Sequence, residues 1–196
     1  MVRLRYGNTN TYFIPADKGG LLVDTDYAGT LPAFYKALKA AGLTVKDISY
    51  VMATHYHPDH MGIIGELMKQ GVKLLLIDVQ KDHVHYSDHI FERDGISFVP
   101  VDEASAYVIS CGDSRAFLSE LGIEGEIIHT PSHSEDSLTL VLDDGNCFAA
   151  DLSPFYYIEA FEDSEALKKD WEKLLSLGPK RIHFAHMPGK VLDGQE

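Results

Sequence analysis

The chain has 196 residues, of which 45% are hydrophobic and 24% charged, as expected of a globular protein with one packed core. Its formal net charge of −13 disfavours nucleic-acid binding, and no apolar run reaches the roughly 18 residues of a membrane span. The N-terminus lacks a signal-peptide pattern, and two cysteines are too few for a disulfide framework. We therefore expect one cytoplasmic domain over residues 1–196, with a small-molecule substrate and no nucleic-acid or membrane partner. The sequence leaves the oligomeric state open.

Strand-like and helix-like patterns alternate along the first half of the chain, which indicates the α/β class. Leu31, Phe34, Leu38 and Ala41 share one apolar face and predict a helix from about residue 31 to residue 41. Gly42 suits the position directly after its last turn. In chain order, we expect strands at residues 2–6, 11–14, 21–23, 48–53 and 72–77, and helices at residues 31–41 and 63–70.

The second half begins with a segment of weak periodicity and then returns to short apolar runs. The sequence Asp143-Asp144-Gly145 predicts a hairpin turn between two of these runs. A last helix is expected to begin after Asp163 or Ser164 and to end before Gly178. Its expected apolar stripe consists of Leu167, Trp171, Leu174 and Leu175. We expect strands at residues 99–101, 107–110, 126–130, 137–142, 146–150 and 181–184, and a further helix at residues 114–121.

Three histidines and one carboxylate lie within six residues where the expected strand 48–53 ends. These residues are His55, His57, Asp59 and His60. An extended chain places His55 and His57 on one face, and the following turn can bring Asp59 and His60 near them. Imidazole and carboxylate together suit zinc, iron(II) or manganese(II).

A single histidine is more often a hydrogen-bonded structural residue than a metal ligand. Three histidines packed this closely would repel one another when protonated, whereas a bound metal ion keeps them neutral. The spacing His-x-His-x-Asp-His therefore favours a metal site over a polar loop.

Four further motifs follow in the order of a known family. Asp24 ends a strand, His133 lies in the loop Thr130-Pro131-Ser132-His133, Asp151 ends a second strand, and His186 follows the last strand. With these motifs the chain resembles the metallo-β-lactamase superfamily from about residue 10 to residue 189. The resemblance implies a four-layered αβ/βα sandwich with the metal site at one edge, between two β-sheets. It favours the dinuclear branch that contains glyoxalase II and lactonase-like enzymes.

The resemblance also assigns roles to individual residues. It implies that His55, His57 and His133 bind one metal ion, that Asp59, His60 and His186 bind a second, and that Asp151 bridges the two. Asp24 would lie behind the ligands and hold them in place. The implied cofactor is a pair of divalent metal ions, with zinc favoured and iron or manganese possible.

The chain departs from the family pattern where glycine usually precedes a ligand. Ser132, Ala150 and Ala185 stand directly before His133, Asp151 and His186. Glycine at such positions permits tight backbone turns near the metal ions. Small side chains can occupy many of these turns, so the ligand assignment is kept.

Two divalent ions lower the pKa of a bridging water towards neutrality and generate a hydroxide nucleophile. The resemblance therefore implies a metal-dependent hydrolase of a small ester, thioester or lactone, in which Asp59 orients the hydroxide. The alternatives are a phosphodiesterase that acts on a small phosphorylated substrate, iron-dependent sulfur or oxygen chemistry, and a metal-binding sensor without turnover. A nuclease of the RNase Z kind is disfavoured because no basic arm for RNA is present.

An aromatic segment follows the expected ligand Asp151. Phe155, Tyr156 and Tyr157 come after Pro154, which disfavours a helix at Ser153 and indicates a turn. These rings can either pack in the core or form an apolar wall of the substrate pocket. We predict that Tyr156 or Tyr157 contacts the substrate, with Phe155 beside them.

The remaining histidines and the cysteines are expected to have structural roles. His85 and His89 are four residues apart but lack a ligand pattern, which favours the surface or a pocket rim. His129 and His183 lie on strands ahead of the ligand loops. Cys111 is expected in a loop and Cys147 in a strand, and neither occupies a motif position.

Overall fold

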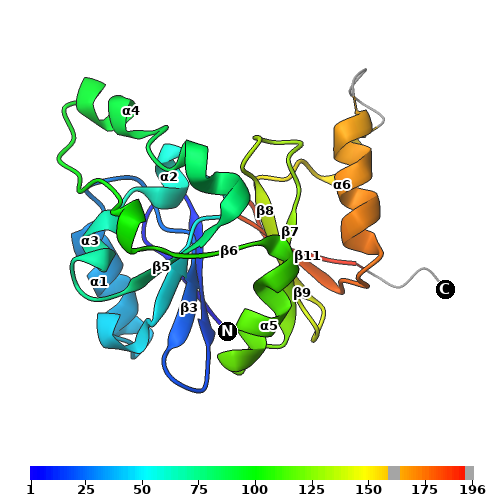
Figure 1. Ribbon diagram of the computed structural model, residues 1–196, viewed down its shortest axis with the longest axis horizontal. Coiled ribbons are helices and arrows are strands. Elements are labelled where there is room, and N and C mark those ends of the chain that lie inside the picture. Colours follow the sequence, from blue (N-terminus) through cyan, green and yellow to red (C-terminus); the bar gives the residue numbers. More distant parts are fainter. Residues whose placement is uncertain (159–163, 193–196) are drawn as a thin grey trace. The chain divides into compact units, whose positions relative to one another are not determined.

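The computed structural model describes residues 1–158 and 164–192. The chain divides into two compact units, Met1–Ser110 and Cys111–Glu196, and each unit contains its own β-sheet with helices beside it (Figure 1). The predicted α/β class is confirmed. The expectation that residues 1–196 form a single domain stays a prediction.

The first unit contains a six-stranded sheet in the order β1-β2-β3-β4-β5-β6. Its strands are β1 (Val2–Arg5), β2 (Asn10–Pro15), β3 (Gly20–Val23), β4 (Tyr50–Met52), β5 (Lys73–Ile77) and β6 (Tyr107–Ile109). The first three strands pair antiparallel, whereas β3 to β6 run parallel. Parallel strands buried on both faces have nearly continuous apolar sequences, which explains the run Leu74–Ile77.

The helices of the first unit are short, apart from α1. They are α1 (Leu31–Ala40), α2 (Pro58–Met61), α3 (Ile64–Met68) and α4 (Asp88–Arg93), with 3₁₀ turns η1 (Val45–Asp47), η2 (Asp78–His83) and η3 (Glu103–Ser105). Phe34 and Leu38 of α1 belong to a buried cluster with Leu22 and Val51 of the sheet. The apolar face of the first predicted helix therefore covers the sheet.

The second unit contains a five-stranded sheet in the order β11-β10-β9-β8-β7. Its elements are η4 (Cys111–Asp113), α5 (Ser114–Glu120), β7 (Gly125–His129), β8 (Leu138–Leu142), β9 (Asn146–Ala150), η5 (Phe155–Tyr157), α6 (Glu165–Leu175), β10 (Arg181–Phe184) and β11 (Lys190–Val191). Leu167, Trp171 and Leu174 of α6 form a buried cluster with Ile182 and Phe184 of β10. This contact places α6 against the sheet next to the strand that leads to His186.

Two sequence predictions about the elements were wrong. Residues 99–101 form no strand; their backbone lies against α3, where a Cβ on Gly65 would come within 2.0 Å of the Val99 carbonyl oxygen. The helix expected at residues 63–70 is present as α3, with ends one and two residues inside the predicted bounds. Leu175 is 42% exposed and does not belong to the buried stripe of α6.

Helix α6 begins where the sequence predicted. Ser164 is the N-cap residue of α6, and the other candidate, Asp163, lies outside the described residues. Within residues 1–158 and 164–192, no helix combines the length and the apolar character that a bilayer span requires.

Candidate metal centre

Asp24 organises the first group of predicted site residues from directly behind them. It follows β3 with a φ of 60°, in the left-handed region, and is 3% exposed. Its carboxylate accepts hydrogen bonds from the Thr54 backbone N–H at 2.6 Å and from the Thr54 hydroxyl at 2.9 Å. The same carboxylate lies 3.0 Å from Nδ1 of His60. One buried side chain thus connects the end of β3 with both ends of the His-x-His-x-Asp-His loop.

The four predicted ligands of the first unit lie close together. Nε2 of His55 is 3.0 Å from Nδ1 of His57, and the ring centroids of His55 and His60 are 4.0 Å apart. Nε2 of His60 lies 3.9 Å from a carboxylate oxygen of Asp59. His55 and His60 are buried. The first unit therefore presents three imidazoles and one carboxylate as a single cluster.

Several buried polar side chains outside the ligand motif hold its backbone, and the sequence analysis missed them. Thr25 donates to the His60 carbonyl through its hydroxyl at 3.2 Å and through its backbone N–H at 2.9 Å. The Gln80 amide donates to the Ala53 carbonyl at 3.1 Å, and the Ser87 hydroxyl donates to the Tyr56 carbonyl at 2.5 Å. These residues come from segments without a recognisable motif, so only the folded chain identifies them.

The second unit gathers the other three predicted ligands around one carboxylate. Nε2 of His186 lies 3.3 Å from Oδ1 of Asp151, and Nε2 of His133 lies 3.7 Å from Oδ2 of the same residue. Each histidine therefore approaches a different oxygen of Asp151. The carboxylate of Asp151 thus lies next to two imidazoles, one near each of its oxygens.

Of the three residues that replace the usual glycines, only one has a conformation that favours glycine. Ala150 has a φ of 47°, in the left-handed region, whereas Ser132 and Ala185 do not have positive φ. The Ala150 carbonyl accepts a hydrogen bond from the Ala185 N–H at 2.9 Å, which joins the two ligand loops. The replacements are thus compatible with the loops, at the cost of strain at Ala150.

The aromatic segment after Asp151 lies on the surface. Phe155, Tyr156 and Tyr157 form the 3₁₀ turn η5 and are 55%, 59% and 39% exposed. The Phe155 ring contacts Trp171 edge to face, with centroids 5.9 Å apart, and the Lys190 ammonium lies 5.8 Å from the centroid of the Tyr156 ring. Phe155 is thus partly anchored to the core, while the two tyrosines are presented outward.

The remaining histidines have local contacts. Nδ1 of His85 lies 2.8 Å from the Asp88 carboxylate. His183 is buried, stacks on Phe148 and lies 2.9 Å from the Asn146 side-chain oxygen. Nε2 of His129 lies 2.7 Å from the Glu135 carbonyl. Each of these three histidines therefore has a contact within the protein, and none of the contacts requires a metal ion.

The cysteines lie where the sequence predicted them. Cys111 begins the 3₁₀ turn η4, and Cys147 is buried in β9. Burial raises the pKa of the Cys147 thiol, so this side chain stays protonated. A protonated, buried thiol is unsuited to a nucleophilic role.

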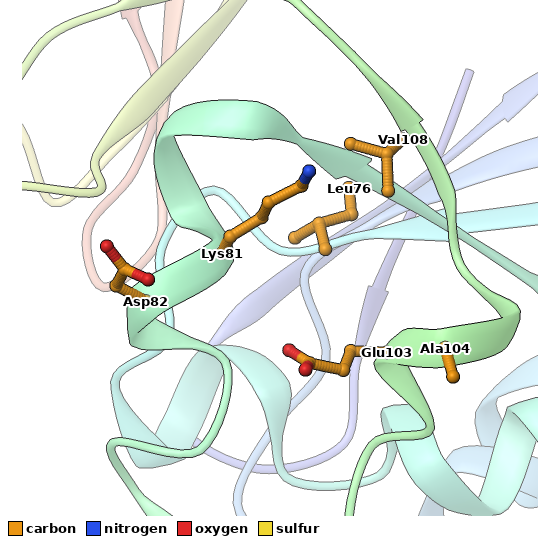
Figure 2. A pocket seen from close by; sticks show the side chains of 6 residues that line it. All are labelled: Leu76, Lys81, Asp82, Glu103, Ala104 and Val108. Atoms are coloured by element: carbon orange, nitrogen blue, oxygen red, sulfur yellow. The ribbon is translucent and has the colours of Figure 1, made fainter.

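The first unit also has an open cavity of about 380 Å³ beside β5 and β6. Figure 2 shows Leu76 and Val108 next to each other, with Lys81 and Asp82 from η2 and Glu103 and Ala104 from η3. The charged side chains around it are exposed to solvent. None of the predicted site residues lines this cavity.

The two sheets and the histidine–carboxylate clusters are typical of a class of α/β proteins that can bind metal ions. Each of the seven predicted ligands belongs to a group of histidine and carboxylate side chains that could hold a metal ion. Residues 4–186 match the metallo-beta-lactamase superfamily. The chain is a member of this superfamily, as the sequence motifs predicted.

Two curated relatives illustrate the range of the family. The chain is 27% identical over 191 residues to the beta-lactamase-like protein 2 homolog of Drosophila melanogaster, covering 94% of this chain and 60% of the relative. It is 26% identical over 141 residues to the atrochrysone carboxyl ACP thioesterase of Aspergillus fumigatus, covering 70% of this chain and 27% of the relative. The chain therefore spans less than two thirds of the length of these relatives.

Solved structures share the fold at low sequence identity. The protein TTHA1623 in a di-iron-bound form superposes with a TM-score of 0.71 at 22% identity, covering 97% of this chain and 93% of that chain. A metallo-beta-lactamase family protein of Thermus thermophilus gives a TM-score of 0.70 at 19% identity, covering 93% of this chain and 70% of that chain. These similarities confirm the predicted metallo-β-lactamase-like fold.

Proposed function

We propose that this protein is a dinuclear metal-dependent hydrolase of a small ester, thioester or lactone. The observation that carries the proposal is the donor set: five histidines and two aspartates of the superfamily pattern, gathered in two clusters. In the proposed site, His55, His57 and His133 would hold one divalent ion, Asp59, His60 and His186 would hold the second, and Asp151 would be shared by both.

The residues of each unit fit such ions. In the first unit, the contact between Asp24 and Nδ1 of His60 directs Nε2 of that ring towards Asp59. A carboxylate behind a ligating histidine fixes the ring and raises its basicity. In the second unit, the two oxygens of Asp151 each face a different imidazole. Zinc suits this mixture of nitrogen and oxygen donors. Iron is the next metal to test, because the structural neighbour TTHA1623 holds two irons.

When bound, the two ions supply an activated water and polarise the carbonyl of the substrate. The chain itself supplies the other elements of the reaction. Asp59 accepts a proton from the attacking water and orients it, and Asp24 holds His60 in the required tautomer. The buried histidine cluster keeps bulk water away from one side of the reacting centre.

A thioester is the substrate class that we test first. One relative is named as a thioesterase that acts on an acyl carrier protein, and thioester and ester hydrolysis share the same tetrahedral chemistry. We further propose that the exposed rings of Tyr156 and Tyr157, with Phe155 beside them, contact the acyl part of the substrate. A small-molecule substrate, a cytoplasmic location and a single domain over residues 1–196 belong to this proposal.

The test is a panel of substrates with the metal-loaded protein. Protein loaded separately with zinc, iron(II) and manganese(II) is assayed with an acyl thioester, p-nitrophenyl acetate, a lactone and bis-p-nitrophenyl phosphate. The proposal expects turnover of at least one carboxylic ester, thioester or lactone that is lost on chelation. Turnover of the phosphodiester alone would assign phosphodiesterase activity, and bound metal without any turnover would favour a sensor.

A further inference from the structure

The hydroxyl of Thr9 reaches the predicted catalytic aspartate from a distant part of the chain. Thr9 lies between β1 and β2, and its Oγ1 donates a hydrogen bond of 2.8 Å to the backbone carbonyl of Asp59. Its side chain is fully buried, although 50 residues separate the two positions. The turn between β1 and β2 is thus connected directly to the backbone of a predicted ligand.

Thr9 is itself held in place by a buried carboxylate. The Thr9 N–H donates to Oδ2 of Asp26 at 3.0 Å, and Asp26 also accepts from the Tyr27 N–H at 2.7 Å. Asp26 is 3% exposed. A Cβ on Gly7 would come within 2.1 Å of Oδ2 of Asp26, so only glycine allows the turn to pack this closely. These contacts fix the position of the Thr9 hydroxyl.

The Asp59 backbone needs such support because its helix is very short. Helix α2 has only four residues, Pro58–Met61, so few helical hydrogen bonds can form within it. Thr9 holds the Asp59 carbonyl, and Thr25 holds the next carbonyl, that of His60. Two threonines from outside the motif therefore set the direction in which the Asp59 and His60 side chains leave the backbone.

The second unit contains a comparable support from helix α6. Oδ2 of Asp170 accepts a hydrogen bond of 2.8 Å from the N–H of Ser132, the residue directly before His133. Asp170 is 6% exposed. Its neighbour Trp171 donates through Nε1 to the Ser153 carbonyl at 2.8 Å, two residues after Asp151. One turn of α6 thus holds both the loop of His133 and the loop that follows Asp151.

We propose that Thr9 and Asp170 are positioning residues of the metal centre, one in each unit. Thr9 acts through the backbone of Asp59, and Asp170 acts through the backbone of the His133 loop. The inference rests on the proposed metal-dependent function. It extends that function to two residues that belong to none of the ligand motifs.

The experiment on Thr9 compares variants that differ in one hydroxyl group. Thr9→Val removes the hydroxyl and keeps the shape, whereas Thr9→Ser keeps the hydroxyl. Thr11→Val is the matched control, because Thr11 is equally buried but its hydroxyl faces Tyr6 at 3.4 Å. The affinity for Zn²⁺ alone is measured by competition with a chromophoric chelator, and the Tm of the metal-free protein is recorded. We expect about tenfold weaker Zn²⁺ binding for Thr9→Val, with wild-type affinity for Thr9→Ser and Thr11→Val.

The outcomes separate this inference from the proposed function. Wild-type protein that binds none of Zn²⁺, Fe²⁺ and Mn²⁺ would overturn both. If the wild type binds Zn²⁺ and Thr9→Val binds it equally well, the role of Thr9 alone is wrong. A loss that Thr11→Val reproduces, together with an equal loss of Tm, would assign Thr9 to general stability and also overturn the inference. Thr9→Ala replaces Thr9→Val if the latter does not fold.

The experiment on Asp170 distinguishes its acceptor oxygen from its charge. Asp170→Ala removes the acceptor for the Ser132 N–H, and Asp170→Asn keeps one side-chain oxygen. Glu172→Ala removes a negative charge from the exposed side of α6 as the control. We expect about tenfold weaker Zn²⁺ binding for Asp170→Ala, most of which Asp170→Asn restores, and no change for Glu172→Ala. Equal affinity of Asp170→Ala and wild type would overturn the role of Asp170.

Discussion

Asp24 and His60 form a buried carboxylate–imidazole pair in the first unit, with Oδ2 and Nδ1 3.0 Å apart. The pair joins the end of β3 to the helix that carries Asp59, across 36 residues of sequence. Because Nδ1 faces the carboxylate, the opposite nitrogen of the ring, Nε2, is the one directed towards Asp59. If His60 binds a metal ion through Nε2, Asp24, a residue outside the ligand motif, would favour the tautomer that this binding requires.

The first prediction concerns this pair. Asp24→Asn should weaken Zn²⁺ binding by about 10–100-fold, because an outer partner of a ligating histidine is lost. Asparagine tolerates the left-handed backbone found at Asp24, so the metal-free protein should remain folded. Chelator competition gives the affinity, and Tm gives the stability. Unchanged affinity in a folded Asp24→Asn variant would contradict the role assigned to Asp24.

The second prediction concerns the strained residue before Asp151. A non-glycine residue in the left-handed region costs roughly 1–2 kcal/mol, and Ala150 has a φ of 47°. Ala150→Gly relieves this strain, but glycine also increases the conformational entropy of the unfolded chain, which opposes the gain. The net effect should be a free energy of unfolding that is higher by up to about 1 kcal/mol. Ala149→Gly, at a neighbouring buried position without positive φ, should lower it by about 1 kcal/mol. Urea unfolding measures both, and equal losses would contradict the strain at Ala150.

The strands and the longer helices could be predicted because their patterns are local. The strand predicted at residues 181–184 matches β10, and the helix predicted at residues 31–41 matches α1 to within one residue. Gly42, with a φ of 74°, follows the C-cap as expected. An apolar stripe and a glycine after the last turn depend only on neighbouring residues, so they are visible in the sequence.

Features that depend on tertiary contacts could not be predicted. Residues 99–101 have a strand-like sequence, but they pack against Gly65 of α3 instead of joining the sheet. The sequence motifs identified the seven candidate ligands, whereas Thr9 and Gln80 carry no motif and support the ligand loop through distant hydrogen bonds. Such partners are set by the path of the chain in space.

The third prediction concerns pH. Burial raises the pKa of Glu66 on α3 above its ordinary value. The folded state then binds a proton more tightly than the unfolded state, so this group lowers stability as pH rises through its pKa. Glu66→Gln should therefore have a higher free energy of unfolding than wild type at pH 7. The difference should vanish below about pH 4, the ordinary range of glutamate.

Urea unfolding at a series of pH values checks this dependence. Glu92→Gln is the control, since Glu92 is an exposed residue of α4, and it should leave the curve of stability against pH nearly unchanged. A Glu66→Gln variant that is less stable than wild type at pH 7 would show that the carboxylate is stabilised by its surroundings, contrary to the prediction.

The fourth prediction concerns metal stoichiometry. The purified protein should bind about two divalent ions per chain. Asp151→Ala should weaken both, because the proposed bridge contributes to each. His57→Ala should weaken one, and His89→Ala, on the exposed side of α4, should weaken neither. Elemental analysis after dialysis against a weak chelator gives the occupancies. Full occupancy in a variant that lacks the imidazoles of His55, His57 and His133 would refute the assignment.

The last prediction concerns the rings that follow Asp151. Tyr156 and Tyr157 contact each other, with centroids 4.8 Å apart, and present exposed surface that core packing does not explain. If they bind the acyl part of the substrate, Tyr156→Ala or Tyr157→Ala should lower kcat/KM by about tenfold, the effect of one lost apolar contact or hydrogen bond. Metal content should stay at the wild-type level, because neither residue is a proposed ligand.

Phenylalanine variants separate the two ways in which a tyrosine can contribute. Wild-type kinetics for Tyr→Phe with a loss for Tyr→Ala indicates ring packing, whereas equal losses indicate a hydrogen bond from the phenol. Tyr35→Ala is the control, since Tyr35 is 41% exposed on α1 and has no proposed contact with substrate. If the double variant Tyr156→Ala/Tyr157→Ala retains wild-type kcat/KM on the best substrate found, the two rings are not part of the pocket. The search for the acyl-binding wall would then move to residues 80–95, the segment that contains most of η2 and all of α4.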